Sequence, residues 1–213
     1  MSTEAKVKLH IRKKALPKIS ISNVDVSKEE IRESILSKNP NIRSLVEKGH
    51  SFELLFIHEV KNTSFRNAIF KVGPVIRNSI AENKFKVFVG LKNCSVYDRI
   101  HYKTCFNCQH ISTVKGSHTS ENCPIKSPVC RYCAQKHRSS DCGVKNEPNS
   151  HHCINCKNSD KHKQDAKSHI ANANTCPLVI DLINSIISNT DYLGYETKNL
   201  NMPQGQLIQG ANA

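Results

Sequence analysis

Nine of the ten cysteines of this chain lie between residues 105 and 176, and they form three C-x-x-C pairs, each followed by a histidine and a further cysteine. Two cysteines separated by two residues form a turn that aims both sulfurs at one point. A histidine and a cysteine shortly afterwards complete a tetrahedral set of the kind that zinc occupies. Four such ligands without an open position are typical of a structural site. We therefore expect residues 105–176 to fold around three zinc ions.

The three expected ligand sets differ in spacing. The second is the most compact, C-x2-C-x3-H-x4-C, whereas nine residues precede the histidine of the first and twelve that of the third. In the third set, His151, His152 and His162 compete for the histidine position, and we assign His169 because it leads into Cys176. The expected ligands are Cys105, Cys108, His118 and Cys123 in the first cluster (105–123), Cys130, Cys133, His137 and Cys142 in the second (130–142), and Cys153, Cys156, His169 and Cys176 in the third (153–176).

Cysteine usage agrees with the compartment that the rest of the sequence indicates. No run of 18 apolar residues exists, so no membrane span is expected. The first residues, MSTEAKVKLHIRKK, are charged and lack the apolar core of a signal peptide. We expect a cytoplasmic or nuclear protein, in which cysteines serve as metal ligands more readily than as disulfides. Cys94 stands apart from the clusters and is expected to be a plain core residue.

The charge balance predicts the class of partner. Lysine and arginine number 31 and aspartate and glutamate 18, which gives a formal net charge of +13. An excess of this size favours a polyanionic partner. Nucleic acid is the leading interpretation and an anionic membrane surface the weaker alternative.

The cysteine-poor half alternates strand and helix signals. Strands are expected over 18–24 (KISISNV), 52–60, 65–72 and 86–91. Between the first two, a helical pattern over 26–46 opens with a Ser27/Glu30 capping box and breaks at Pro40. A second helix is expected over 74–83. The order β-α-β-β-α-β predicts an α+β, ferredoxin-like domain over 17–98, the arrangement that RNA-recognition motifs use.

This predicted sheet lacks the usual RNA-stacking side chains. If Ala68, Phe70 and Val72 face the core, that strand exposes Asn67, Ile69 and Lys71, and the stacking position of the first strand is Ser20. RNA-recognition motifs place aromatic rings at such positions. We therefore interpret the domain as a scaffold or protein-contact module.

The zinc clusters carry the expected nucleic-acid contacts. Phe106 and Tyr132 lie between paired cysteines, where an exposed ring can stack on an unpaired base or pack over its own metal loop. Cations around them can neutralise phosphates. The expected cationic contacts are Lys103, Lys115, Lys126, Arg131, Lys136 and Arg138.

The two ends of the chain carry simpler signals. Residues 1–16 are basic and are expected to be a disordered arm that touches phosphates without sequence preference. Residues 178–190 have apolar side chains at helical spacing, which predicts a helix that packs on its own domain or supports self-association. Residues 191–213 are polar and are expected to be disordered.

Three stretches together resemble a known family: KVGPVIRNSIAENKFKVFVGLKNCSVYDRIHYKTCFNCQ, then PVCRYCAQKHRSSDC, and finally CINC followed by HIANANTCP. The chain is similar over about residues 16–180 to the gag-like first-open-reading-frame proteins of animal non-LTR retrotransposons of the jockey-like LINE type. The resemblance implies an RNA-recognition-motif-like domain followed by tandem CCHC zinc knuckles, which coat element RNA and act as a strand-annealing chaperone. Two departures are the KGSH segment after an insertion in the first cluster and the long Cys-to-His loop of the third.

Two other function classes compete with a nucleic-acid-binding protein. A protein-interaction adaptor would use the zinc modules and the apolar helix, but it would not need the basic charge. A zinc deaminase would need an open coordination position and an H-x-E motif, and neither is present among the clusters. We therefore expect a non-enzymatic protein whose partner is single-stranded RNA or DNA, without a membrane or small-molecule partner.

Overall fold

The computed structural model describes residues 14–60, 63, 65–112 and 118–192. These form two compact units. The N-terminal unit holds residues 14–96 together with 189–192, and the C-terminal unit holds residues 97–188. Most of the predicted basic arm and the predicted tail from residue 193 lie outside the described residues. Within the described ranges, no helix is long and apolar enough to cross a membrane.

The N-terminal unit is a mixed α+β structure built on a five-stranded sheet. The strands are β1 (Lys18–Val24), β2 (Phe52–Glu59), β3 (Arg66–Val72), β4 (Lys86–Val89) and β5 (Lys92–Asp98), in the spatial order β2-β3-β1-β5-β4. Strand β3 pairs antiparallel with both β1 and β2, and β4 pairs antiparallel with β5. The predicted strands over 18–24, 52–60 and 65–72 are therefore confirmed.

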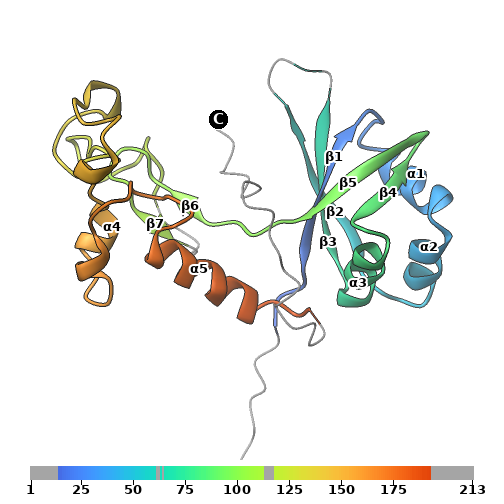
Figure 1. The fold of residues 1–213 in the computed structure, drawn as a ribbon. Coiled ribbons are helices and arrows are strands. Elements are labelled where there is room, and N and C mark those ends of the chain that lie inside the picture. Colours follow the sequence, from blue (N-terminus) through green and yellow to red (C-terminus); the bar gives the residue numbers. More distant parts are fainter. Residues whose placement is uncertain (1–13, 61–62, 64, 113–117, 193–213) are drawn as a thin grey trace, which may run out of the picture. The chain divides into compact units, whose positions relative to one another are not determined.

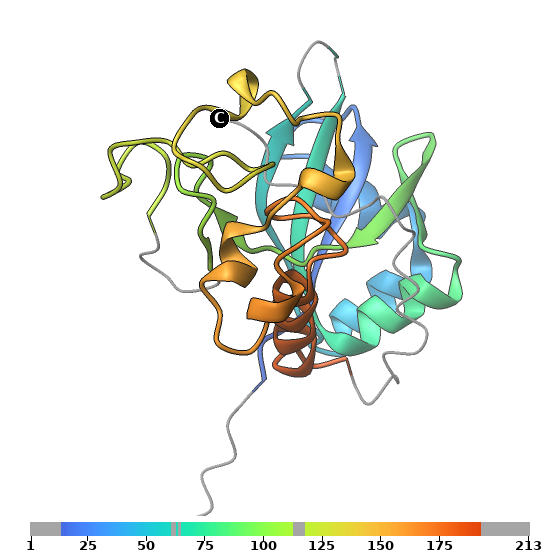
Figure 2. The same ribbon diagram turned by 60° about the vertical axis from the view of Figure 1, so that its left-hand side comes forward.

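Three helices cover one face of this sheet (Figures 1 and 2). They are α1 (Ile31–Lys38), α2 (Pro40–Glu47) and α3 (Pro74–Glu82). The capping box is present, because Ser27 Oγ accepts the backbone N–H of Glu30 and Glu30 Oε2 accepts that of Ser27. Pro40 ends the first helix as predicted and opens the second, α2, since proline is well suited to a first helical position.

The core lies between these helices and the sheet. Phe52 and Phe70 stack with ring centroids 4.6 Å apart at its centre. Burial of such apolar side chains contributes most of the stability of a small domain. The fully buried members are Ile19, Ile21, Val24, Ile31, Ile35, Ile42, Ala68, Phe70, Val72, Ile76, Ile80, Val87, Val89 and Val96.

The fourth predicted strand, over 86–91, is confirmed as β4, which forms a hairpin with the next strand, β5. Strand β4 lies at the edge of the sheet, and β5, which the sequence did not indicate, is the neighbour of β1. Gly90 turns the chain with a φ of +60°, a conformation that suits glycine. The segment KNCSVYD is mostly polar, so its composition did not indicate a strand. Its inward side chains are those of Cys94 and Val96. Cys94 is thus a core residue, as predicted.

The exposure predicted for Ile69 is wrong. Ala68, Phe70 and Val72 do face the core, but Ile69 is only 1% exposed. It stands on the central strand β3, paired with Ser20 of β1 on one side and with Phe56 of β2 on the other. A pattern read along one strand does not reveal such lateral neighbours.

Residues 189–192 belong to the N-terminal unit although they follow the last helix. Ala15 donates its backbone N–H to the carbonyl of Asn189 at 2.9 Å and accepts that of Asp191 at 2.8 Å. Tyr192 is buried, and its ring centroid lies 5.2 Å from the guanidinium carbon of Arg77. The disordered tail was predicted to begin at residue 191, but Asp191 and Tyr192 are held by these specific contacts.

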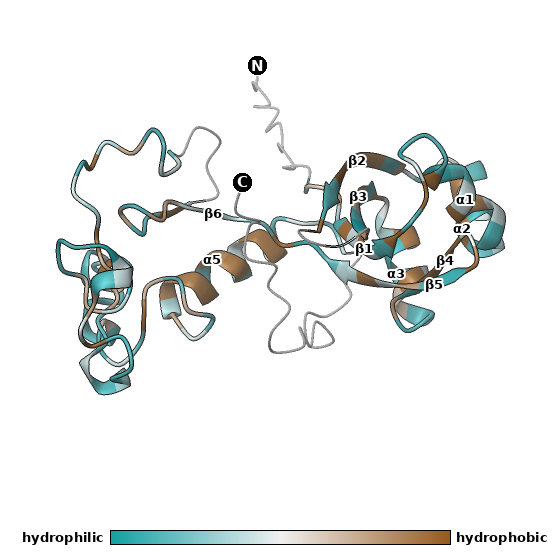
Figure 3. Cartoon of the chain, turned by 90° about the horizontal axis from the view of Figure 1, so that it is seen from above, coloured by the Kyte–Doolittle hydropathy of each residue, from teal (hydrophilic) through white to brown (hydrophobic). Residues whose placement is uncertain are grey.

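The C-terminal unit contains little regular structure. A short antiparallel pair, β6 (Lys103–Thr104) and β7 (Ile111–Ser112), is followed by the one-turn helix α4 (Ile154–Lys157) and by α5 (Pro177–Ser188). The predicted C-terminal helix is confirmed and ends two residues early. Its residues are largely hydrophobic (Figure 3), and Val179, Leu182 and Ile183 pack with the cysteines of the third cluster.

Candidate metal centres and the adjoining pocket

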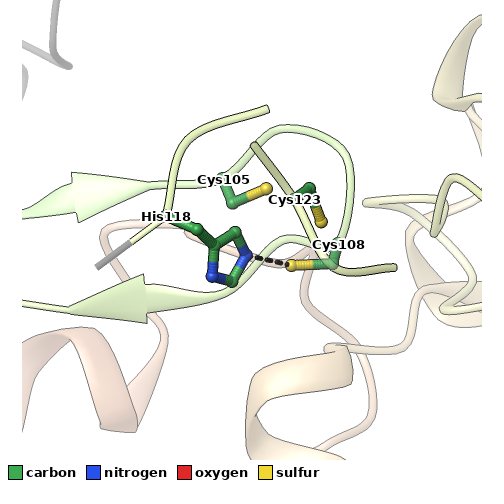
Figure 4. A group of neighbouring side chains, drawn as sticks. All are labelled: Cys105, Cys108, His118 and Cys123. Atoms are coloured by element: carbon green, nitrogen blue, oxygen red, sulfur yellow. Dashed lines mark hydrogen bonds between the residues drawn. The ribbon is translucent and has the colours of Figure 1, made fainter. Parts of the chain in front are cut away.

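The structure brings together three groups of side chains, each with three cysteines and one histidine. Within each group the possible ligand atoms all lie within 4.8 Å of one another, a spacing that can hold a metal ion. In the first group all four side chains point toward a common centre (Figure 4). The groups are Cys105, Cys108, His118 and Cys123; Cys130, Cys133, His137 and Cys142; and Cys153, Cys156, His169 and Cys176. They contain the same residues that the spacing predicts.

The first and second clusters each contain a backbone turn with the same hydrogen-bond pattern, here called the knuckle turn. In the first, Cys105 donates its N–H to His110 O at 2.8 Å and accepts the N–H of Gln109 at 2.7 Å. In the second, Cys130 donates to Gln135 O at 2.8 Å and accepts the N–H of Ala134 at 3.0 Å. Each turn thus folds the C-x-x-C segment back on itself and directs both sulfurs inward.

The hairpin of β6 and β7 carries the knuckle turn of the first cluster. His118 follows the long spacer after this hairpin, and its Nε2 lies 3.1 Å from Cys108 Sγ. The His110 ring stacks on the His118 ring at 5.6 Å between centroids, so His110 supports the ligand histidine. Residues 113–117 of the long spacer lie outside the described residues.

The third cluster is built differently and is the most buried. Helix α4 begins within its C-x-x-C segment, and Cys153, Cys156 and Cys176 are each 0% exposed. His169 Nε2 lies 3.5 Å from Cys156 Sγ. Because helix α5 starts directly after Cys176, it closes the cluster from one side.

The competing histidines of the third cluster have other partners. His162 Nε2 lies 2.9 Å from Asp181 Oδ2 on α5. His151 Nε2 is 3.2 Å from the carbonyl of Lys145, and His152 Nδ1 lies 3.1 Å from a neighbouring carbonyl. The geometry therefore selects His169, as the sequence assignment did.

The thiols within a cluster share protons. A hydrogen bond from Cys153, with Sγ atoms 3.8 Å apart, lowers the pKa of Cys176 to about 4 and raises the pKa of Cys153. Burial alone would raise the pKa of Cys130, but the backbone N–H groups of Cys133 and Tyr132 together with the thiols of Cys142 and Cys133 outweigh it and lower that pKa to about 7. One thiol in each of these two clusters therefore loses its proton more easily than a free thiol, and a dication would displace the remaining protons.

Backbone hydrogen bonds join the three clusters into one body. Val129, which leads into the second cluster, donates its N–H to the carbonyl of Asn107 in the first at 2.7 Å. His152 donates to the carbonyl of Tyr132 at 2.7 Å, which ties the third cluster to the second. The sequence offers no sign of these bonds, because backbone groups carry no side-chain signature.

A pocket of about 520 Å³ opens where the first and second clusters meet. Phe106 forms part of its wall and is 53% exposed. Three cations and no acidic residue are found among the described side chains around it. The lining consists of Phe106, Asn107, Gln109, Ser120, Lys126, Pro128, Val129, Arg131, Arg138 and Ser139.

Arg131, which lines this pocket, has a buried side-chain nitrogen without a hydrogen-bond partner among the described residues. Its backbone is fixed, because its N–H bonds to Ser139 Oγ at 2.9 Å. Its Nε is buried and has no hydrogen-bond partner within the described part of the chain. A buried donor without a partner is costly, so the Arg131 side chain carries such a cost in the described conformation.

The predicted contact residues divide between the pocket and other places. Phe106, Lys126, Arg131 and Arg138 line it. Tyr132 does not, and its ring packs 5.5 Å from the His151 ring. The remaining predicted cations are Lys103 and Lys136, which are exposed away from the lining, and Lys115, which lies outside the described residues.

Sequence reasoning missed Gln109, which is 3% exposed and forms part of the lining. It directly follows the second cysteine, where the knuckle turn needs a positive φ that glycine adopts most easily. A large polar residue at that position was the available signal, because it must gain enough from its side chain to offset the backbone cost.

No family model matches this chain, and neither a curated protein nor a solved structure does. The function is therefore argued from the site itself.

Proposed function

We propose that this chain is a zinc-dependent, non-enzymatic protein that binds single-stranded nucleic acid, with RNA as its main partner. The pocket between the first and second clusters supports this proposal most directly. It combines an exposed aromatic ring, Phe106, with the cations Lys126, Arg131 and Arg138. A ring for base stacking beside cations for the phosphates is the usual means of binding an unpaired strand.

Zinc is the metal that best fits the donor set. Three thiolates and one imidazole are soft and borderline ligands, and a closed set of four is typical of structural zinc. Metal binding would also supply folding free energy, which in zinc-finger peptides amounts to about 10–16 kcal/mol. The C-terminal unit has little regular structure of its own, so three zinc ions would hold the pocket in shape.

The N-terminal unit is proposed to be a ferredoxin-like scaffold. In that arrangement the spatial order of four strands is 4-1-3-2 or its reverse, and β2-β3-β1-β5 has this order when β5 counts as the fourth strand. Strand β4 is then an addition at the edge. On the face away from the helices, Ser20 and Ile69 stand where RNA-recognition motifs carry stacking rings. This favours a supporting role over direct RNA contact.

The resemblance to gag-like retrotransposon proteins suggests the biological role that we propose for this binding. A chain with basic charge and tandem zinc knuckles would coat element RNA and assist strand annealing in the cytoplasm or nucleus. The competing adaptor role relied on the apolar helix. That helix, α5, packs its Val179, Leu182 and Ile183 within its own unit, which favours a structural role for this part of its surface.

Fluorescence anisotropy with the full-length, zinc-loaded protein tests the proposal. Labelled single-stranded RNA and DNA oligonucleotides are compared with a duplex of the same length. We expect Phe106→Ala to weaken single-strand binding by about 5- to 100-fold, since stacking contributes about 1–3 kcal/mol per base. Phe88→Ala is the matched control, because Phe88 is 45% exposed but lies on β4. Absence of single-strand binding by the unmodified protein, or equal affinity of both variants, would refute the proposal.

A further inference from the structure

We infer that the third cluster positions the nucleic-acid pocket without contributing to its wall, by holding the side chain of Gln109. This inference rests on the proposed function of the pocket. None of the described residues that line the pocket comes from the third cluster. Two segments of that cluster, one at Asn155 and one at Ala171 and Asn172, nevertheless form hydrogen bonds to lining residues.

Gln109 holds two neighbouring parts of the pocket wall. Its side-chain Nε2 donates to the carbonyl of Phe106 at 2.8 Å and to that of Val129 at 3.1 Å. One amide group thereby fixes the backbone of the exposed ring and the segment that enters the second cluster. The orientation of Phe106 relative to the second cluster therefore depends on how firmly Gln109 is held.

The third cluster supplies that hold through two asparagines. Asn155 lies between Cys153 and Cys156, and its Nδ2 donates to the backbone carbonyl of Gln109 at 2.7 Å and to Asn172 Oδ1 at 2.9 Å. Asn172 in turn donates to Gln109 Oε1 at 3.4 Å. The acceptor and donor ends of the Gln109 amide are thus both engaged, which leaves its side chain a single orientation.

A second connection reaches Arg131, the other fixed element of the wall. Ala171, the residue before Asn172, donates its backbone N–H to the carbonyl of Arg131 at 2.8 Å. Ala171 is 0% exposed and packs in the apolar cluster of the third site. The same short segment thus contacts both Gln109 and Arg131.

The unusual spacing of the third cluster is what places this segment. Ala171 and Asn172 lie in the six-residue spacer between His169 and Cys176, and a metal bound by those two ligands would hold the spacer at both ends. Asn172 also has a φ of +63°, a left-handed conformation that asparagine tolerates better than most residues. The long spacer therefore helps to position the pocket wall. A metal at the third cluster would affect the geometry of the pocket without touching the bound strand.

Asn172→Ala tests the inference, with Asn158→Ala as the control. Asn158 belongs to the same cluster segment but is exposed, so its removal leaves the amide network intact. In the zinc-loaded full-length protein we expect Asn172→Ala to retain three zinc ions per chain and to weaken single-strand binding by about 5- to 30-fold, the effect of about 1–2 kcal/mol lost with a buried hydrogen bond. The control should bind like the unmodified protein.

A double-mutant cycle separates positioning from general damage. If Asn172 acts through Phe106, then adding Asn172→Ala to Phe106→Ala should weaken binding much less than it does alone. Fully additive losses would overturn the inference, as would unchanged binding by Asn172→Ala.

Amide hydrogen exchange provides a readout that does not depend on nucleic acid. We expect the backbone N–H of Gln109 to exchange faster in Asn172→Ala and in Cys153→Ser, which loses the third metal, than in the control. If the unmodified protein binds no single strand, the proposed function fails while this exchange measurement still tests the connection. Unchanged exchange at Gln109 in both variants would refute the inference alone.

Discussion

Gln109 and Ala134 occupy the same position in two successive knuckle turns, and both have a left-handed backbone, with φ values of +66° and +61°. Each directly follows the second cysteine of its pair and donates its N–H to the carbonyl of the first. Only Gln109 uses its side chain, in bonds to Phe106 and Val129. The two positions therefore impose the same backbone cost, and only one of them recovers it through side-chain contacts.

Replacement of each residue by glycine should have opposite effects. A left-handed alanine costs about 1–2 kcal/mol, and glycine loses about 0.5–1 kcal/mol in chain entropy on folding. We expect Ala134→Gly to raise the free energy of unfolding by about 0.5–1 kcal/mol. Gln109→Gly should lower it, since the partly buried carbonyls of Phe106 and Val129 lose their donor. Urea titration of the zinc-loaded protein measures both changes, and a stabilised Gln109→Gly variant would contradict this account.

Zinc content tests the ligand sets directly. The double replacement of Cys130 and Cys133 by serine should lower the bound zinc from three ions per chain to two and unfold the second cluster, because two of its four ligands are lost. Cys94→Ala is the control, since Cys94 lies in the sheet and outside every cluster. It should retain all three ions. Atomic emission measures the stoichiometry, and three ions in the double variant would show that the ligand map is wrong.

Residue patterns predicted the elements of the N-terminal unit better than their pairing. The β1 segment was predicted at its observed bounds because Ile19 and Ile21 alternate with polar residues and Pro17 precedes them. Strand β5 was missed because its outward residues are polar and its first two, Lys92 and Asn93, resemble a turn. Burial of Ile69 depends on neighbouring strands, which a local pattern does not contain.

The three groups of candidate metal ligands were predictable because cysteine and histidine spacing encodes them almost alone. The pocket was predicted only as a set of separate residues. Phe106 and Arg131 are 25 positions apart, and the bond from Val129 to the carbonyl of Asn107 is one of the contacts that hold their segments together. Such a bond depends on the path of the backbone after both clusters have folded, so the sequence does not indicate which predicted contacts share one site.

The buried side chain of Asn39 completes the edge of the N-terminal sheet. Its Nδ2 donates to the carbonyl of Phe88 at 2.8 Å, and its Oδ1 accepts the N–H of Phe88 at 3.0 Å. We expect Asn39→Ala to lower the free energy of unfolding by about 1–3 kcal/mol, because a buried amide that satisfies edge-strand groups is lost. Asn41→Ala, at an exposed asparagine that bonds to Ser79, should change it by less than about 0.5 kcal/mol. Equal effects of the two replacements would contradict the prediction.

The contact between His162 and helix α5 should depend on pH. The hydrogen bond to Asp181 raises the pKa of His162 above its ordinary value of 6.5, with a smaller contribution from Asp165 and opposition from burial and Lys161. A raised pKa means that the folded state holds the proton more tightly. The stabilisation is therefore complete below pH 6.5 and is lost as the pH rises through the folded-state value.

Thermal unfolding of the zinc-loaded protein between pH 6 and pH 9 checks this dependence. The unmodified protein should be more stable than His162→Gln at the acidic end, and the difference should shrink as the pH rises. The pKa of Asp181 is lowered, first by Lys161 and then by His162, so the carboxylate stays ionised throughout this range. A difference that grows toward pH 9 would have the wrong sign.

Salt dependence should show which cations of the pocket touch the bound strand. Each phosphate contact to a single strand contributes about 0.7 to the slope of the logarithm of the binding constant against the logarithm of the salt concentration. Arg138 is exposed and lines the pocket, so we expect Arg138→Ala to reduce that slope by about 0.7 and to weaken binding at low salt. Lys163→Ala removes an equally exposed cation of the same unit that is not part of the lining, and the slope should stay unchanged. If both variants reduced the slope equally, the strand would be attracted by net charge rather than held in the pocket.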